Sequence, residues 1–292
     1  MITTILAWGQ NYPGIIKQLN DCTQATQGVN ENTYILTGQF QHDQAHYSRA
    51  VFKRVNQTEL QFYQGALYAD NLAPRPMIID VNQSCVLLEY LDPSPIWNTN
   101  RSLSKVFNII QYLYTQEIPT WLELPFGGSE FPKQPPVQVI SDLNIDRVNE
   151  QALIQGVHIV EACRDMITDT TKTICHGDLS YINAGMRHNT MLLYDWQNLC
   201  MAPIEYDLAY LFYVVSEFRK DMPHEGHLYE HFMHTTGITI NSNLCRVLYL
   251  YRAIYEQLPF YAKHSSKLMQ QVLHNRIPTI VGRINTWYKT QL

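Results

Sequence analysis

The pattern of apolar and polar positions predicts a strand-rich first part of the chain. Two β-rich runs, 33–36 and 50–55, are separated by a polar stretch over 39–48, which indicates an antiparallel pair joined by a long turn. Two further runs, 77–80 and 85–90, are joined by a short polar turn and indicate another pair. We therefore expect a small antiparallel sheet.

Two helices are expected beside this sheet. Residues 9–22 carry a proline near their start and apolar side chains at Ile15, Ile16 and Leu19, a spacing typical of one face of a helix. A second helix is predicted over 58–69, because Thr58 can cap its amino end and an acid follows in the first turn.

Beyond the second strand pair the pattern is mainly helical. Apolar positions recur at helical spacing over 102–117, 143–168, 203–218, 222–236, 243–262 and 264–289. A tight hairpin interrupts them, with strands over 184–187 and 191–194. The segment 119–136 holds five prolines, so it is either a loop that covers a substrate or a plain connector. The run 92–95, with two prolines, marks the expected boundary between two lobes.

Charge and composition exclude several classes of partner. The 292 residues include 21 Lys and Arg against 26 Asp and Glu, a net charge of −5 without a basic stripe, which argues against a nucleic-acid partner. The amino terminus lacks the basic start of a signal peptide, and no apolar run approaches the roughly 18 residues needed to cross a bilayer. We therefore expect a cytoplasmic protein with no membrane partner, and the oligomeric state is left open.

The six cysteines show no paired spacing. Disulfide-stabilised domains and zinc sites place cysteines at recurring short spacings, so we expect reduced thiols in this chain. The cysteines are Cys22, Cys85, Cys163, Cys175, Cys200 and Cys245.

The stretch 174–183, together with the hairpin after it, carries the candidate chemistry. A phosphoryl-transfer site needs a carboxylate that orients the attacking hydroxyl group, and oxygen ligands for magnesium. Asp178 can supply the first, while Asn183 and Asp195 can supply the second. Each residue alone could instead belong to an Asx turn or a strand end. Taken together, with the hairpin between them, they favour the phosphoryl-transfer site.

Three motifs follow one another in this region, His-Gly-Asp-Leu-Ser-Tyr-Ile-Asn at 176–183, Tyr-Asp-Trp at 194–196 and Glu-Tyr-Asp-Leu-Ala at 205–209. They resemble the successive signatures of the aminoglycoside phosphotransferase and choline kinase family, which shares the protein-kinase-like fold. The resemblance implies an α+β, two-lobed protein. A small antiparallel β-sheet N-lobe (1–92) would bind the nucleotide, and a mainly helical C-lobe (93–292) would hold the catalytic loop and the substrate site.

The resemblance also implies roles in the second lobe and the hairpin. Asp178 would be the catalytic aspartate that accepts or orients the proton of the substrate hydroxyl group, and His176 and Asp207 would hold the catalytic loop by hydrogen bonds. Asn183 would be a magnesium ligand, and Asp195 would bridge Mg²⁺ and the nucleotide phosphates.

In the first lobe, the resemblance implies a site for ATP. Lys53 would reach the α- and β-phosphates with Glu59 as its partner, and Gly28 lies in the loop that would cover the phosphates with backbone amides. Glu89 and Leu91 lie where a hinge would bind adenine through backbone groups. The alternatives are a surface lysine beside a strand, a solvated first-turn acid and a plain hairpin turn at Gly28.

The substrate is expected to be a small alcohol, leaning to a cationic amino alcohol such as choline or thiamine. Aromatic faces can hold a quaternary ammonium or thiazolium by cation–π attraction, although most aromatic residues in a helical lobe belong to its core. Acids at Glu217, Asp221 and Glu225 can recognise a cation or form a solvated helix face. An aminoglycoside or sugar kinase and a catalytically silent kinase-like binding protein are the alternatives. The aromatic candidates are Trp97, Trp121, Tyr210, Tyr213, Tyr251, Tyr255 and Trp287.

Four histidines recur at helical spacing in the segment 222–236. The last three, His227, His231 and His234, can share a face as metal ligands do, or the four form a polar helix face or the rim of a substrate site. They are His224, His227, His231 and His234.

Overall fold

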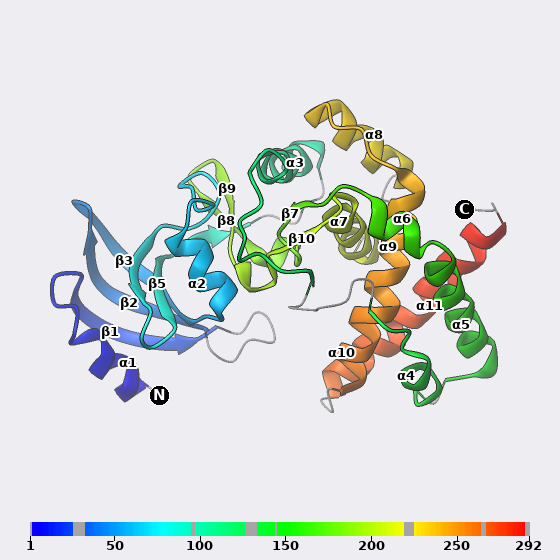
Figure 1. Cartoon of the computed structure of the whole chain (residues 1–292). Helices are drawn as coiled ribbons and strands as arrows, with labels where there is room; N and C mark the ends of the chain where they lie inside the picture. The colour runs from blue at the N-terminus through cyan, green and yellow to red at the C-terminus, as the bar shows by residue number, and fades with distance from the viewer. Residues whose placement is uncertain are drawn as a thin grey trace. The chain divides into compact units, whose positions relative to one another are not determined.

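The computed structural model describes residues 2–25, 33–94, 97, 99–125, 133–143, 145–218, 225–263 and 267–289. The chain forms two compact units (Figure 1). The first unit comprises Met1–Trp97 and Ser180–Leu199, and the second comprises Asn98–Leu179 and Cys200–Leu292. The division of roles between the predicted lobes 1–92 and 93–292 stays a prediction.

A five-stranded antiparallel sheet with the order β1-β2-β3-β5-β4 is the centre of the first unit. Its strands are β1 (Ile16–Gln24), β2 (Thr33–His42), β3 (Ala45–Arg54), β4 (Pro76–Asp80) and β5 (Cys85–Glu89). Helix α1 (Ile2–Gly9) precedes the sheet, and α2 (Gln57–Gln64) follows β3. Both predicted antiparallel pairs, β2 with β3 and β4 with β5, are confirmed.

The predicted helix over 9–22 is wrong, because β1 occupies the second half of this segment. The pairing of β1 with β2 shifts register twice, once after Ile16 and once after Leu19. Each irregularity of this kind adds a residue to one strand, so the inward positions Ile16, Leu19 and Cys22 fall three residues apart. That spacing imitates the face of a helix.

The polar stretch 39–48 also differs from the prediction, because β2 and β3 continue through it. The turn is confined to Asp43 and Gln44, whose φ angles are 47° and 64°. Positive φ at both central residues is the signature of the tight type I′ turn, whose twist suits two paired strands. Backbone hydrogen bonds between β2 and β3 hold this polar part of the hairpin together. Its residues alternate little between apolar and polar, so the sequence pattern does not show the strands there.

A small second sheet completes the first unit. It has the order β6-β8-β9, with β6 (Asp92–Pro93), β8 (Ala184–Arg187) and β9 (Thr190–Leu193). The predicted hairpin is confirmed by the antiparallel pairing of β8 with β9. The segment that carries Asn183 and Asp195 therefore packs with the first unit, although it is far from that unit in sequence.

Asp80 ties α1 and the chain after it to the β4–β5 hairpin. The residue is 8% exposed, and its carboxylate accepts hydrogen bonds from Trp8 Nε1 at 2.8 Å, Tyr12 OH at 2.9 Å and the Gln83 backbone N–H at 3.1 Å. Burial alone would raise the pKa of Asp80, but the hydrogen bonds outweigh burial and lower it.

We expect Asp80→Asn to lower the free energy of unfolding by roughly 1–3 kcal/mol at neutral pH, since hydrogen bonds to a charged acceptor are lost. Because the folded-state pKa is depressed, this stabilisation is present above the unfolded pKa of about 3.9 and is lost as the pH falls through the folded value. Urea unfolding of both proteins from pH 7 to acid checks this. Parallel stability curves at all pH values would contradict it.

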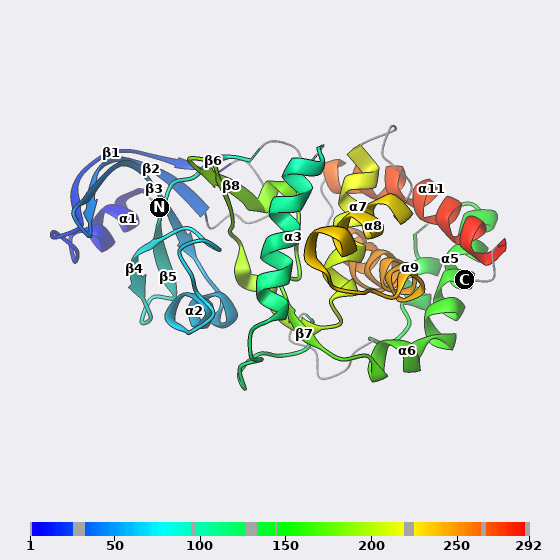
Figure 2. The same cartoon turned by 90° about the horizontal axis from the view of Figure 1, so that it is seen from above.

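The second unit is mainly helical, as predicted. Helix α9 contacts both α7 and α5, and α11 contacts α5 (Figure 2). Strands β7 (Thr173–Cys175) and β10 (Cys200–Ala202) form an antiparallel pair. The helices are α3 (Asn100–Tyr114), α4 (Val137–Ser141), α5 (Arg147–Ala162), α6 (Arg164–Asp169), α7 (Glu205–Phe218), α8 (Glu225–Thr236), α9 (Ser242–Tyr251), α10 (Leu258–Lys263) and α11 (Lys267–Lys289).

Two predicted helices differ in detail. The helix predicted over 143–168 begins later, because the Asp146 side chain caps α5, and it breaks at Cys163, whose φ of −105° and ψ of 16° leave the helical region. The helix predicted over 243–262 contains a π-helical segment, Arg252–Gln257, between α9 and α10.

All six cysteines are free thiols. None of the helices in the described part of the chain combines the length and apolar character that a bilayer crossing requires. Part of the segment 119–136 lies outside the described residues, so its two predicted roles both stay predictions.

Candidate active site

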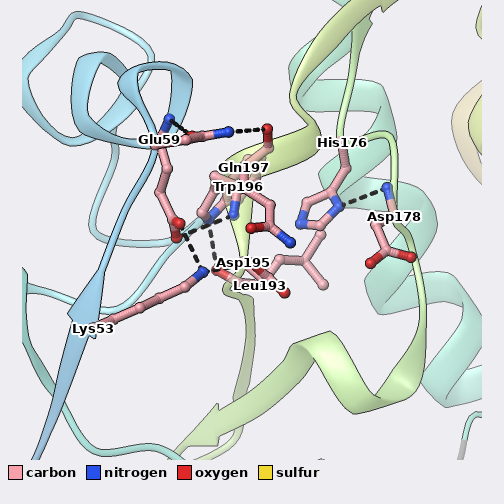
Figure 3. A network of polar contacts seen from close by, with 9 residues as sticks. Lys53, Glu59, His176, Asp178, Leu193, Asp195, Trp196 and Gln197 are labelled. Carbon is pink, nitrogen blue, oxygen red and sulfur yellow. Dashed lines mark hydrogen bonds and ion pairs between the residues drawn. The ribbon is translucent and has the colours of Figure 1, made fainter. Parts of the chain in front are cut away.

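Lys53 is the centre of a buried ionic group in the first unit (Figure 3). It lies on β3 and is 5% exposed. Its Nζ lies 2.7 Å from Glu59 Oε2 and 2.5 Å from Asp195 Oδ1. The three predicted residues therefore meet through side chains, and the alternatives of a surface lysine and a solvated acid are excluded.

The short chain between Lys53 and Glu59 is shaped by Asn56. Asn56 Oδ1 accepts the Glu59 backbone N–H at 2.9 Å and so caps α2, a role predicted for Thr58. Asn56 Nδ2 also donates to Gln197 O at 2.9 Å, which joins the start of α2 to the segment after Asp195. One amide thus turns the chain and anchors it.

Lys53 and the two carboxylates attract one another, while the two carboxylates repel each other. Burial alone would lower the pKa of Lys53, but the carboxylates of Glu59 and Asp195 outweigh burial and raise it. Burial raises the pKa of Glu59, while Lys53 and the Trp196 backbone N–H oppose that rise. Both carboxylates therefore favour the charged form of the lysine inside the fold.

The backbone around Asp195 is also fastened to α2. Asp195 has a φ of 67°, a left-handed conformation that is uncommon for residues with a side chain. The next residue, Trp196, donates its backbone N–H to Glu59 Oε1 at 3.3 Å. The Trp196 ring stacks on the Phe62 ring with 4.1 Å between ring centroids. Positive φ held by such contacts is typical of functional sites.

Asn183 and Asp195 flank the open end of the β8–β9 hairpin. The Tyr194 backbone N–H donates to Asn183 O at 3.0 Å, just beyond the Ala184–Leu193 pair. Asn183 is 7% exposed, and the Asp195 carboxylate is 19% exposed. Amide and carboxylate oxygens at neighbouring strand ends are the donor types that a hard cation such as Mg²⁺ takes.

The catalytic-loop candidate lies in the second unit, directly after β7. The buried Asp207 carboxylate accepts the His176 backbone N–H at 2.7 Å and the Gly177 backbone N–H at 2.9 Å. His176 Nδ1 accepts the Asp178 backbone N–H at 3.3 Å (Figure 3). Asp178 itself is half-buried. The predicted hydrogen bonds from Asp207 and His176 to this loop are therefore present.

A second charged residue reaches this loop and was missed in the sequence. The Arg252 side chain is fully buried and its Nη2 donates to Gly177 O at 2.8 Å. Its Nε lies 3.2 Å from Glu256 Oε2. The available signal was the pair Arg252 and Glu256, four residues apart in the otherwise apolar run 247–256.

The hinge candidates have structural partners. Glu89 accepts the Arg75 backbone N–H at 2.8 Å and forms an ion pair with Arg187, so its side chain ties β5 to the β8–β9 hairpin. Leu91 is 8% exposed and packs on Gly185, where an added Cβ would lie 2.5 Å from the Leu91 Cβ. Adenine binding by their backbone groups stays a prediction. Gly28 lies outside the described residues.

The aromatic candidates for a cation site are mostly core residues. Exposure is 1% for Trp97, 0% for Tyr251, 3% for Tyr255 and 2% for Trp287. The Tyr210 ring is covered by a guanidinium that belongs to the protein itself, 4.2 Å from its centroid. Trp121 is half-buried. The side chains of Tyr213, Glu217 and Glu225, and the whole of Asp221, lie outside the described part.

The histidine segment carries no metal cluster within the described residues, which contain no group of three or more candidate ligands. His231 Nε2 lies 3.1 Å from both Ser104 Oγ and Asn100 O, so it joins α8 to α3. His227 and His231 line a cavity of about 200 Å³ between these helices. His224 lies outside the described residues, and His234 lies in the last turn of α8.

No family model matches the sequence, and no curated protein matches it. Solved structures do. The choline kinase LicA from Streptococcus pneumoniae matches with a TM-score of 0.68 and 15% identity, over 97% of this chain and 99% of that one. The spectinomycin phosphotransferase APH(9)-Ia, solved with ADP and spectinomycin, matches with a TM-score of 0.68 and 12% identity, over 96% of this chain and 98% of that one. A choline kinase from Cryptosporidium parvum matches with a TM-score of 0.68 and 12% identity, over 100% of this chain and 97% of that one. The chain therefore has the two-lobed, protein-kinase-like α+β fold of these small-molecule kinases.

Proposed function

We propose that this protein is a kinase that transfers the γ-phosphoryl group of ATP to a hydroxyl group of a small molecule, with Mg²⁺. The observation that carries the proposal is the buried Lys53 ammonium held by Glu59 and Asp195. Removing a cation and two acids from water costs free energy of folding, and phosphate binding is a function that requires such a buried cation. The solved kinases with the same fold support the proposal.

Asp178 would act on the substrate. Its carboxylate accepts the proton of the hydroxyl group as the hydroxyl oxygen bonds to the γ-phosphorus and the bond to the β,γ-bridging oxygen breaks. The products are a phosphate monoester and ADP. Two backbone N–H groups of the loop that carries Asp178 donate hydrogen bonds to the Asp207 carboxylate and hold the loop in place. Little reorganisation of this loop is therefore needed at the moment of transfer.

Lys53, Asn183 and Asp195 would hold the nucleotide and the metal. The amide and carboxylate oxygens at the open end of the hairpin fit a hard cation, and the lysine fits a phosphate oxygen. Bound Mg²⁺ and ATP supply the transferable phosphoryl group and neutralise its charge. Glu59 keeps the lysine in place, and the residues around Glu89 and Leu91 would receive the adenine.

We propose a cationic amino alcohol such as choline or thiamine as the first substrate to test. Two of the solved structures named above are choline kinases, which supports this order. The aromatic faces that sequence reasoning offered for a cation are mostly buried, so they support it little. Aminoglycosides and sugars follow, because the spectinomycin phosphotransferase has the same fold.

A screen for ADP release tests the proposed function. The panel contains choline, ethanolamine, thiamine, homoserine, hexoses and aminoglycosides, each with ATP and Mg²⁺, and mass spectrometry of the acceptor identifies the phosphate ester. We expect ADP release that depends on one acceptor class and stops with EDTA. A catalytically silent binding protein would instead show a Mg²⁺-dependent thermal shift with ATP and no ADP with any acceptor.

A further inference from the structure

Arg252 has an environment that general packing does not explain. It is 0% exposed, and taking a guanidinium out of water is costly unless its hydrogen bonds and charge are matched. One match is Glu256, whose Oε2 lies 3.2 Å from Arg252 Nε. Glu256 in turn accepts the Tyr206 hydroxyl at 2.9 Å. A further contact of Arg252, from its Nη2 to Gly177 O, reaches the loop before Asp178.

The backbone of Gly177 is held between two opposite charges. Its N–H donates to Asp207 Oδ1 at 2.9 Å, and its carbonyl accepts from Arg252 Nη2 at 2.8 Å. Gly177 has a φ of 77°, in the left-handed region that glycine enters without steric cost. An anion on one side and a cation on the other restrict the freedom of this glycine, and the carbonyl belongs to the peptide bond that leads into Asp178.

Arg252 also supports the Asp178 side chain through an aromatic ring. Its guanidinium lies 4.1 Å from the Tyr206 ring centroid and 4.2 Å from that of Tyr210, so both rings pack against it. The Tyr210 hydroxyl hydrogen-bonds the Asp178 side chain. Arg252 therefore acts on Asp178 by two routes. It bonds the carbonyl of the peptide that precedes Asp178, and it packs on the tyrosine that bonds the Asp178 carboxylate.

The backbone that carries Arg252 is unusual as well. Arg252 and Glu256 both lie in the π-helical segment Arg252–Gln257. The π-helix is rare and is found frequently at functional sites. Here the π turn contains both members of the buried ion pair that meets the catalytic-loop candidate and α7.

We propose that Arg252 is a positioning residue for Asp178, acting as a cationic clamp on the Gly177 carbonyl and on Tyr210. Its effect on turnover rests on the proposed kinase function, whereas its effect on the loop does not. The clamp has no role in nucleotide binding, since Lys53, Glu59 and Asp195 belong to the other unit. Loss of Arg252 therefore lowers kcat and leaves KM for ATP unchanged.

The test compares Arg252→Met/Glu256→Gln with the wild type. The double change removes both buried charges together, which avoids leaving one of them unpaired, and the introduced glutamine can still accept the Tyr206 hydroxyl. We expect cooperative unfolding, a kcat lowered roughly 10²-fold by the misplaced carboxylate, and an unchanged KM for ATP. Amide hydrogen exchange at residues 176–178 should accelerate. Arg246→Met, which removes an arginine packed on the Trp287 ring, is the matched control and should change none of these.

Each outcome decides the proposal. Wild-type kcat and unchanged amide exchange in the double variant would overturn it. If no acceptor supports ADP release in the wild type, the kinase function fails, and the exchange rate alone decides whether Arg252 holds the loop. If the double variant does not fold, Arg252→Lys retains the charge next to Glu256 but lacks the planar fork, and a wild-type kcat in that variant would overturn the proposal.

Discussion

Asp178→Ala is expected to lower kcat by roughly 10²–10⁴-fold, the range in which a general base contributes to catalysis. The nucleotide affinity should be retained, because Lys53, Glu59 and Asp195 keep their contacts with one another. Asp178 is half-buried, and its backbone N–H bonds His176, so the alanine leaves the loop backbone intact. A loss in kcat at constant KM for ATP would identify a group that acts in the transition state.

The measurement is steady-state kinetics with the best acceptor from the screen, with calorimetric titration of a non-hydrolysable ATP analogue. Asp165→Ala, which removes an exposed acid from α6 in the same unit, is the control and should behave as the wild type. Asp178→Asn separates charge from shape and should be as inactive as the alanine variant. Full turnover in either Asp178 variant would refute the assignment of Asp178.

Lys53→Met is expected to impair both ATP use and stability. Removing a fixed positive group from a phosphate site should lower kcat/KM for ATP by roughly 10²–10³-fold. The change also leaves Glu59, which is 0% exposed, without its counter-charge. Breaking a buried ion pair in this way costs roughly 3–5 kcal/mol of unfolding free energy.

A second variant separates the two effects of Lys53. Lys53→Met/Glu59→Gln removes the stranded charge, so the unfolding free energy should recover in large part while kcat/KM stays low. Lys17→Met, which removes an exposed lysine of β1, should alter neither quantity. Denaturant unfolding and ATP titrations at saturating acceptor provide the measurements. Activity that recovers together with stability would show that Lys53 serves folding alone.

Much of the candidate site could be predicted because its residues lie in short, ordered motifs. Asp178, Asn183 and Asp195 stand close together in sequence on a loop and a hairpin, and the hairpin is predicted by local turn and strand signals. Lys53 and Glu59, whose roles the family resemblance implied, lie on one strand and at one helix start. Long amphipathic helices were predicted equally well, since their period of apolar residues is a local property.

The errors arose where pairing between strands alters the local pattern. Positions 15, 16 and 19 predict a helix by spacing, yet Ile16 and Leu19 lie on β1, because two register irregularities against β2 change which residues face inwards. The cap of α2 was placed at Thr58, slightly beyond the true cap at Asn56, because both residue types can cap and only the fold selects between them.

The sequence by itself therefore determined the chemistry, meaning which acids, amide and lysine are available and in which order. Only the tertiary structure decided how they are held. It assigned the hairpin over 184–193 to the first unit, buried the aromatic residues that a cation would need, and brought Arg252 to Gly177 from 75 residues away. Contacts of that separation depend on packing of whole elements, and no local pattern of residues encodes them.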